Sequence, residues 1–150
     1  MVIGELYGAT EGNSGMSTWG FDVEPGVVGY IPPVVAPMWP IGFFKVDAIT
    51  GELVRDRNGR CVRCSPGEPG ELLGKIAETP DRAYEGYTDP HASNAKVAEG
   101  VVTAGDRYFR TGDLLSCDRR GYARFVDRLG DTFRWKVRGM GGRRCSQSRV

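Results

Sequence analysis

The chain has 150 residues and a formal net charge of +1, with 40% hydrophobic and 26% charged residues. This is the length of one ordinary domain, and the balance of apolar and charged residues is that of a globular protein. The small net charge excludes the strong positive field that would favour nucleic acid as a partner. The 22 glycines exceed the usual share, which favours turns and short strands over long helices.

The first predicted strand covers residues 2–7, and a polar turn follows at 8–13. Residues 26–44 then carry no charge and are numerous enough to cross a bilayer. An interior proline removes a hydrogen bond from a helix and clashes with the preceding turn. This segment is therefore predicted to be extended chain and turns lying over a core. Four prolines interrupt it: Pro32, Pro33, Pro37 and Pro40.

From residue 43 onward the pattern is mainly that of β-structure, with short apolar runs between Gly, Pro, Asn and Asp. The strongest hairpin signal is the dipeptide Asn58-Gly59. Turns are also predicted at 47–52, 65–70, 118–121 and 128–131. Strands are predicted at 43–48, 52–55, 71–77, 108–117, 122–127 and 132–136.

One helix is predicted, over residues 90–100, with Pro90 near its start and Gly100 as its stop. After Lys136 the sequence changes character, because residues 137–150 are rich in Gly, Arg and Ser and have little apolar periodicity. Such a composition cannot bury enough apolar surface to order a chain. A disordered tail is therefore predicted there.

The chain has 4 cysteines and one histidine, His91. Cys61 and Cys64 form a Cys-x-x-Cys pair, which is half of the four-ligand set that a structural zinc ion needs. Cys117 and Cys145 show no second paired spacing. We therefore favour reduced cysteines in or beside a hairpin over a zinc site.

The first chemical motif is the segment Tyr-Gly-Ala-Thr-Glu-Gly-Asn at residues 7–13. An adenine can stack on its aromatic ring, and a phosphate can approach its glycine backbone and its threonine hydroxyl. Its carboxylate can hold Mg²⁺, which prefers oxygen ligands. Taken alone, the segment is equally consistent with an ordinary polar turn after a strand.

The second motif is Tyr-Phe-Arg-Thr-Gly-Asp at residues 108–113. A carboxylate only accepts hydrogen bonds, so Asp113 can accept from both of two vicinal ribose hydroxyls. The alternative is a turn aspartate or a cap.

The third motif covers residues 127–136, with the sequence DRLGDTFRWK. Arg128 can donate a charge-assisted hydrogen bond to a phosphate or ribose oxygen. Trp135 and its two basic neighbours also fit a half-buried aromatic ring flanked by solvated bases.

In their order and spacing, the segments YGATEGN, YFRTGDLL and GYARFVDRLGDTFRWK resemble the adenylate-forming superfamily of acyl-CoA synthetases, luciferases and peptide-synthetase adenylation domains. The wording GDTFRWK, together with SPGEPGELLG upstream, is similar to the fatty-acid transport protein (very-long-chain acyl-CoA synthetase) branch. The resemblance covers residues 3–136.

The resemblance implies roles for four residues of the first motif. Tyr7 would lie against the adenine, and Gly8 would let the nucleotide approach the backbone. Thr10 would contact the α-phosphate, and Glu11 would help to hold Mg²⁺. Thr10 and Glu11 are thus the expected catalytic residues.

The other two motifs take their implied roles from the same resemblance. Asp113 would bind the ribose hydroxyls, and Arg128 would contact the ribose or the phosphate. Asp131 would be the hinge about which a small C-terminal domain rotates between the two half-reactions.

The implied fold is a mainly β piece of the adenylate-forming enzyme fold, with few short helices (α+β). Residues 1–127 would be the C-terminal part of the AMP-binding N-terminal domain, including its distorted β-barrel. Residues 128–136 would form the hinge and the first hairpin of the C-terminal domain, and 137–150 a divergent tail.

The implied reaction joins a fatty acid, ATP and coenzyme A to give acyl-CoA, AMP and pyrophosphate through an acyl-adenylate. The phosphate loop and the catalytic lysine of the family have no counterpart in these residues, since Lys136 belongs to the hinge motif. We therefore expect a truncated chain that is inactive and marginally stable alone. The alternative is a non-catalytic isoform or gene-model product with at most weak nucleotide binding.

The cofactors implied for the whole enzyme are ATP or AMP, Mg²⁺ and coenzyme A. Its implied partners are the fatty acid and coenzyme A, with association of this chain with the full-length enzyme as a further expectation. Family analogy implies membrane association, at the endoplasmic reticulum or the plasma membrane.

Overall fold

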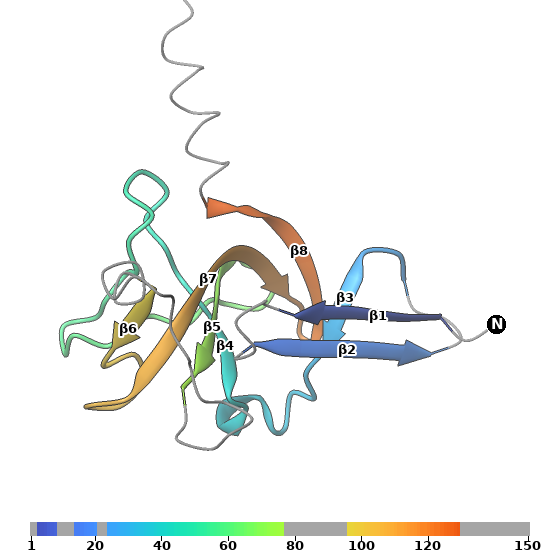
Figure 1. Cartoon of the computed structure of the whole chain (residues 1–150), viewed down its shortest axis with the longest axis horizontal. Helices are drawn as coiled ribbons and strands as arrows, with labels where there is room; N and C mark the ends of the chain where they lie inside the picture. Colours follow the sequence, from blue (N-terminus) through green and yellow to red (C-terminus); the bar gives the residue numbers. More distant parts are fainter. Residues whose placement is uncertain (1–2, 9–13, 21–23, 77–95, 130–150) are drawn as a thin grey trace, which may run out of the picture.

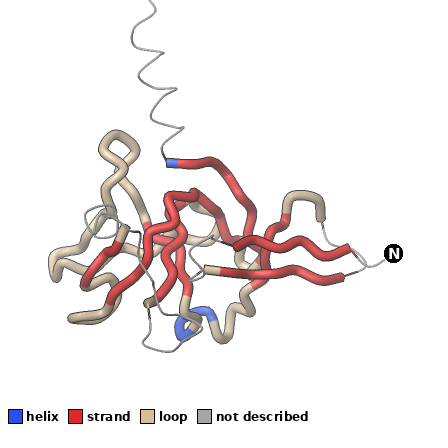
Figure 2. The backbone as a smooth tube through the Cα atoms, in the orientation of Figure 1, coloured by secondary structure: helices blue, strands red, loops and turns tan. Residues whose placement is uncertain are grey.

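The computed structural model describes residues 3–8, 14–20, 24–76 and 96–129. Strands and loops account for nearly all of these residues, and helical conformation among them is limited to the 3-10 turn η1 (Ala36–Met38) and to Leu129 after the last strand (Figure 2). The mainly β fold predicted from the sequence is therefore confirmed. The strands are β1 (Ile3–Gly8), β2 (Gly15–Gly20), β3 (Val27–Tyr30), β4 (Ile41–Phe44), β5 (Gly70–Lys75), β6 (Val97–Glu99), β7 (Arg107–Cys117) and β8 (Tyr122–Arg128).

The strands form two antiparallel sheets (Figure 1). The larger has six strands, in the order β3-β8-β7-β5-β4, with β6 paired to the first residues of β7. The smaller is the hairpin β1-β2, which lies beside β3. In Figure 1 the long strand β7 bends along its length, so the larger sheet curls rather than lying flat.

The centre of the larger sheet is buried on both faces because β5 is apolar on both. Leu72 and Leu73 are adjacent in sequence, so their side chains point to opposite faces, and each joins a different core cluster. Leu72 packs with Met16, Ile31, Ile41, Leu115 and Ala123. Leu73 packs with Phe44, Cys61, Ala98, Val101 and Tyr108.

The hairpin β7-β8 turns where the sequence predicts, at 118–121. The Asp118 carboxylate accepts hydrogen bonds from the backbone N–H groups of Arg120 (2.8 Å) and Tyr122 (3.0 Å). Gly121 has a φ of +95°, and a Cβ atom there would lie 2.1 Å from the carbonyl oxygen of Ile31. Only glycine fits this turn, both in conformation and in space.

The uncharged segment 26–44 forms β3, η1 and β4, which confirms extended chain and turns over a core. Ile31 and Ile41 from this segment are both buried. No helix among the described residues is long and apolar enough to cross a membrane.

Three sequence predictions differ from the structure in the described residues. The strand predicted at 52–55 forms only isolated bridges, Val46 with Leu53 and Arg55 with Cys61. Residues 97–99 form strand β6 rather than the end of a helix, because their backbone pairs with β7 at Arg107–Phe109. The predicted turn at 128–131 begins too early, since Arg128 still belongs to β8 and pairs with Asp113. The rest of the predicted helix, the strand at 132–136 and the tail lie outside the described residues.

The two cysteines of the Cys-x-x-Cys pair lie in different surroundings. Cys61 is buried in the core cluster of Leu73, whereas Cys64 is half-buried and its thiol faces the carbonyl of Pro69 at 3.7 Å. Burial raises the pKa of Cys64 to about 11, so its thiol stays protonated at neutral pH. In the described part of the chain, no three His, Cys, Asp or Glu side chains gather as a metal site.

Candidate functional site

The candidate site is built on an irregularity in the middle of β7. Leu73 of β5 pairs with Arg110, but Glu71, two residues back, pairs with Leu114 four residues on. Two extra residues of β7 must therefore bulge out of the ladder within 111–113. Gly112 has a φ of +75°, which lets the backbone bend sharply there. The bulge changes the direction in which the following side chain, Asp113, points.

Side chains from three strands meet at Asp113. The Tyr7 hydroxyl on β1 donates to Asp113 Oδ2 at 2.7 Å. The Arg128 guanidinium on β8 donates through Nε to Asp113 Oδ1 at 2.9 Å. These residues are 106 and 15 positions from Asp113 in the sequence, so the fold alone brings the three motif residues together.

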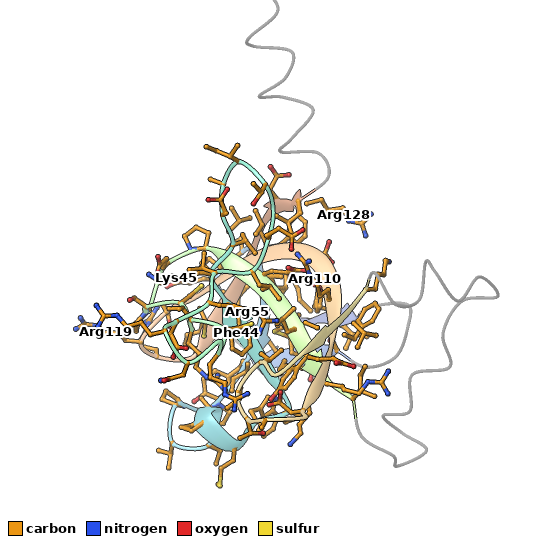
Figure 3. All side chains as sticks on the ribbon, turned by 90° about the vertical axis from the view of Figure 1, so that its left-hand side faces the viewer. Phe44, Lys45, Arg55, Arg110, Arg119 and Arg128 are labelled. Atoms are coloured by element: carbon orange, nitrogen blue, oxygen red, sulfur yellow. The ribbon has the colours of Figure 1, made fainter. Side chains whose placement is uncertain are left out.

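The Asp113 carboxylate is enclosed, while its cationic partner is not. Asp113 is 7% exposed, whereas the side chain of Arg128 is 68% exposed. Figure 3 shows Arg128 at the outer end of β8, with Arg110 lower on the neighbouring strand. The buried carboxylate is therefore in contact with an arginine whose side chain reaches solvent.

Tyr7 is held in its neutral form. Burial raises the pKa of its phenol well above the ordinary value, and the hydrogen bond and negative charge of Asp113 raise this pKa further. The phenol therefore remains a hydrogen-bond donor to the carboxylate at any physiological pH. Its ring is half-buried against the core cluster of Leu72.

A second pair of charges, not predicted from the sequence, lies directly under the bulge. Glu71 is 1% exposed, and its carboxylate accepts from Arg110 Nε (3.2 and 3.1 Å) and Nη2 (2.8 Å). The same carboxylate accepts from the backbone N–H of Gly112 at 3.1 Å. Burial raises the pKa of Glu71, while Arg110 and the Gly112 amide oppose that rise. The one sequence signal for this pair was a glutamate within an otherwise uncharged run, GELLG.

The fold thus gathers part of the predicted site. Tyr7, Asp113 and Arg128 are in contact, and Gly8 follows Tyr7 at the end of β1, where it pairs with Gly15. The three remaining predicted site residues, Thr10, Glu11 and Asp131, lie outside the described residues.

This arrangement has the chemistry to bind a ribose. Two vicinal hydroxyls need a pair of acceptors in one plane, and a carboxylate provides them. Arg128 adds a fixed fork of donors at the same place, and the Tyr7 ring offers an aromatic face beside them. A nucleoside would therefore find stacking, acceptor and donor groups within one site.

Comparison with solved structures defines the class of fold. The chain matches the Vibrio cholerae adenylation domain AlmE in complex with glycyl-adenosine-5'-phosphate, with a TM-score of 0.52, 17% identity and coverage of 85% of this chain and 22% of that one. It also matches the O-succinylbenzoate coenzyme A synthetase MenE from Bacillus subtilis in complex with AMP, with a TM-score of 0.51, 23% identity and coverage of 85% and 27%. The chain therefore has part of the fold of the adenylate-forming enzymes.

Sequence relatives define the branch. The chain is 42% identical over 135 residues to long-chain fatty acid transport protein 1 from Rattus norvegicus, covering 89% of this chain and 21% of that protein. It is 45% identical over 132 residues to the medium/long-chain-fatty-acid–CoA ligase FadD6 from Mycobacterium tuberculosis, covering 88% and 20%. Over the matched residues the chain is therefore similar to the fatty-acid transport proteins, as its motifs predict, and it spans 21% of the length of the first of these relatives. No family model matches it.

Proposed function

We propose that this chain carries the nucleotide-facing side of a fatty acyl-CoA synthetase active site. The observation that carries the proposal is the meeting of Tyr7, Asp113 and Arg128 on three strands. In this arrangement Asp113 accepts hydrogen bonds from the ribose hydroxyls of AMP or ATP. Tyr7 lies against the adenine, and Arg128 donates to the ribose or the phosphate.

The contacts of the ligand-free chain support these roles. Both oxygens of Asp113 are already occupied by side-chain donors, and each carboxylate oxygen has two lone pairs. A ribose can share these oxygens without breaking the fold. Because Arg128 is largely exposed, it can turn toward the ligand at little cost in burial.

The whole protein's chemistry follows from the family. It would convert a long- or very-long-chain fatty acid, ATP and coenzyme A to acyl-CoA, AMP and pyrophosphate, in connection with fatty-acid uptake at a membrane. Thr10 would contact the α-phosphate, and Glu11 would hold the Mg²⁺ that supplies charge neutralisation there. Residues 1–127 would belong to the AMP-binding domain, and Asp131 would be the hinge.

Titration with AMP tests the nucleotide site directly. The wild-type chain is expected to bind AMP weakly, and Asp113→Ala is expected to bind about tenfold or more weakly still, because two hydrogen bonds to a charged acceptor are lost. Asp56→Asn is the matched control, since Asp56 accepts only backbone N–H bonds in the 56–60 turn. Equal affinities for AMP in all three chains would overturn the proposed nucleotide site.

Catalysis by the chain alone is a separate matter. We propose that these 150 residues form no acyl-CoA unaided, since their sequence has no counterpart of the family's phosphate loop or catalytic lysine. Incubation of the pure chain with ATP, palmitate and coenzyme A tests this, and formation of palmitoyl-CoA would contradict it. A non-catalytic role through association with the full-length enzyme is the second candidate. Co-purification of the two proteins, lost on dilution of the chain, would favour it.

A further inference from the structure

Stability alone does not explain why a charged pair, Glu71 and Arg110, occupies this position in the sheet. Taking two charges out of water costs more than their attraction often returns, and apolar side chains of similar volume frequently serve as well. Strand β5 is otherwise apolar in this region, with Leu72 and Leu73 both fully buried. What an apolar residue at position 71 could not do is accept the Gly112 N–H.

Three further contacts fasten the same bulge. The Thr111 hydroxyl donates to the carbonyl of Leu72 at 2.8 Å, and it accepts the backbone N–H of Asp113 at 3.1 Å. Arg110 Nη2 donates to the carbonyl of Gly51 at 2.8 Å as well as to Glu71. Within the bulge, the Gly112 N–H is thus accepted by Glu71 of β5, and the Asp113 N–H by the Thr111 hydroxyl.

We propose that Glu71 and Thr111 are positioning residues for Asp113, and that Arg110 holds the Glu71 side chain in place for this task through its hydrogen bonds. Glu71 fixes the backbone at Gly112, and Thr111 fixes the backbone at Asp113. Together they aim the Asp113 carboxylate at Tyr7 and Arg128. In its ligand-binding consequence this inference rests on the proposed function, but the placement of Asp113 is measurable without a ligand.

The ligand-free measurement uses Tyr7 as the reporter. In chains labelled with tyrosine at the ¹³Cζ position, the Tyr7 resonance is assigned from its loss in Tyr7→Phe. At a pH of about 11, one unit above the ordinary pKa of tyrosine, Tyr7 is expected to stay protonated in the wild-type chain. In Glu71→Gln the Asp113 carboxylate is expected to move away from Tyr7, which lowers the pKa of the phenol, so a larger fraction of Tyr7 ionises at this pH than in the wild-type chain.

Two sets of variants separate positioning from folding. Glu68→Gln is the matched control for Glu71→Gln, because Glu68 forms a half-exposed ion pair with Lys45 at 2.8 Å. Thr111→Val removes the hydroxyl at nearly constant shape, and Thr111→Ser restores it. In Thr111→Val the pKa of the Tyr7 phenol is expected to fall, as in Glu71→Gln. In Thr111→Ser this pKa is expected to keep its wild-type value. Far-UV circular dichroism at the same pH checks that each chain is folded.

The ligand-bound measurement is the discrimination between AMP and 2′,3′-dideoxy-AMP. A well-aimed Asp113 makes AMP bind about tenfold more tightly than the dideoxy analogue, and this ratio falls toward one in Glu71→Gln and Thr111→Val. A purely structural role would weaken both nucleotides equally. The ratio is unchanged in Glu68→Gln and Thr111→Ser.

The outcomes distinguish the two claims. If the wild-type chain binds no nucleotide but Tyr7 ionises early in Glu71→Gln and Thr111→Val, the proposed function fails and the positioning of Asp113 stands. If AMP binds but neither the Tyr7 ionisation nor the ribose ratio changes in these variants, the positioning role is overturned. Should Glu71→Gln not fold, the difference between Thr111→Val and Thr111→Ser decides in the same way.

Discussion

Two aspartates on either side of the first half of β7 show how one residue type serves two purposes. Asp106, just before the strand, accepts three backbone N–H bonds, from Val101 (2.6 Å), Val102 (2.9 Å) and Thr103 (2.7 Å). Asp113, in the bulge, accepts instead from two side chains on other strands, Tyr7 and Arg128.

The difference lies in what can be displaced. The donors to Asp106 are backbone groups of its own loop, which cannot leave without unfolding that loop. The donors to Asp113 are side-chain tips, and a ligand with hydroxyl groups can share or replace them. Of these two aspartates, Asp106 is held by its own loop and is structural, whereas Asp113 is held by side chains from other strands and is a candidate binding group.

The largest expected effect is on folding, at the structural aspartate. Asp106→Ala removes one acceptor from three backbone donors and from the Thr103 hydroxyl (3.1 Å), and we expect a loss of about 2 kcal/mol in the free energy of unfolding. Urea unfolding followed by circular dichroism measures it. The affinity for AMP should not change when it is measured without urea, at a temperature where both chains are folded. If Asp106→Ala lost AMP affinity without being destabilised, the assignment of Asp106 as a structural residue would be wrong.

The reverse pattern is expected at the partner of Asp113. Arg128→Ala should weaken AMP binding about tenfold, by loss of one charge-assisted donor, and should change stability little because the side chain is 68% exposed. Arg119→Ala is the control, since Arg119 lies in the turn at the far end of the same hairpin (Figure 3). Calorimetric titration of both variants decides, and equal AMP affinities would contradict the assignment.

The contribution of Asp106 to the free energy of unfolding should be lost at acid pH. Partial burial tends to raise the pKa of Asp106, but the backbone N–H groups of Thr103, Val102 and Val101 hold it below the ordinary value. A carboxyl with a lowered folded-state pKa stabilises the fold fully above its unfolded pKa of about 4, and this contribution is lost as the pH falls below it. Asp106→Asn should therefore flatten the fall in stability between about pH 4 and 2. Urea midpoints measured across this range test it, and parallel curves for both chains would contradict it.

The sequence motifs contain the three residues that meet at the candidate site, but they do not reveal which residues hold Asp113 in place. Tyr7, Asp113 and Arg128 stand in recognisable motifs, so resemblance marked them. Glu71 is a single charge beside Leu72 and Leu73, and its partner Arg110 is 39 positions away. Burial of a charge depends on such a long-range partner, which local pattern does not reveal.

The same limit applies to the strands. Strands 107–117 and 122–128 were predicted closely, because turn residues at Asp118 and Gly121 mark their ends. Strand β2 was not predicted, since its sequence GMSTWG begins and ends in glycine. Residues 97–99 were assigned to a helix, and pairing with β7 decides otherwise. Tertiary pairing overrides weak local preference in both cases.

The smallest expected effect separates the ring of Tyr7 from its hydroxyl. Tyr7→Phe keeps the aromatic face but removes the donor to Asp113. We expect a loss of about 1 kcal/mol or less in stability, because Arg128 still satisfies one oxygen of the carboxylate and an incoming water can satisfy the other. AMP affinity should change by less than about twofold, since stacking needs the ring alone and the freed oxygen can accept a ribose hydroxyl.

Tyr7→Ala is the contrasting variant, which removes both ring and hydroxyl and should reduce AMP affinity about tenfold. If Tyr7→Phe and Tyr7→Ala weaken AMP binding equally, the hydroxyl of Tyr7 rather than its ring contacts the ligand. Asp113 and Tyr7 would then bind the ligand together through their polar groups, and the aromatic face would not contribute.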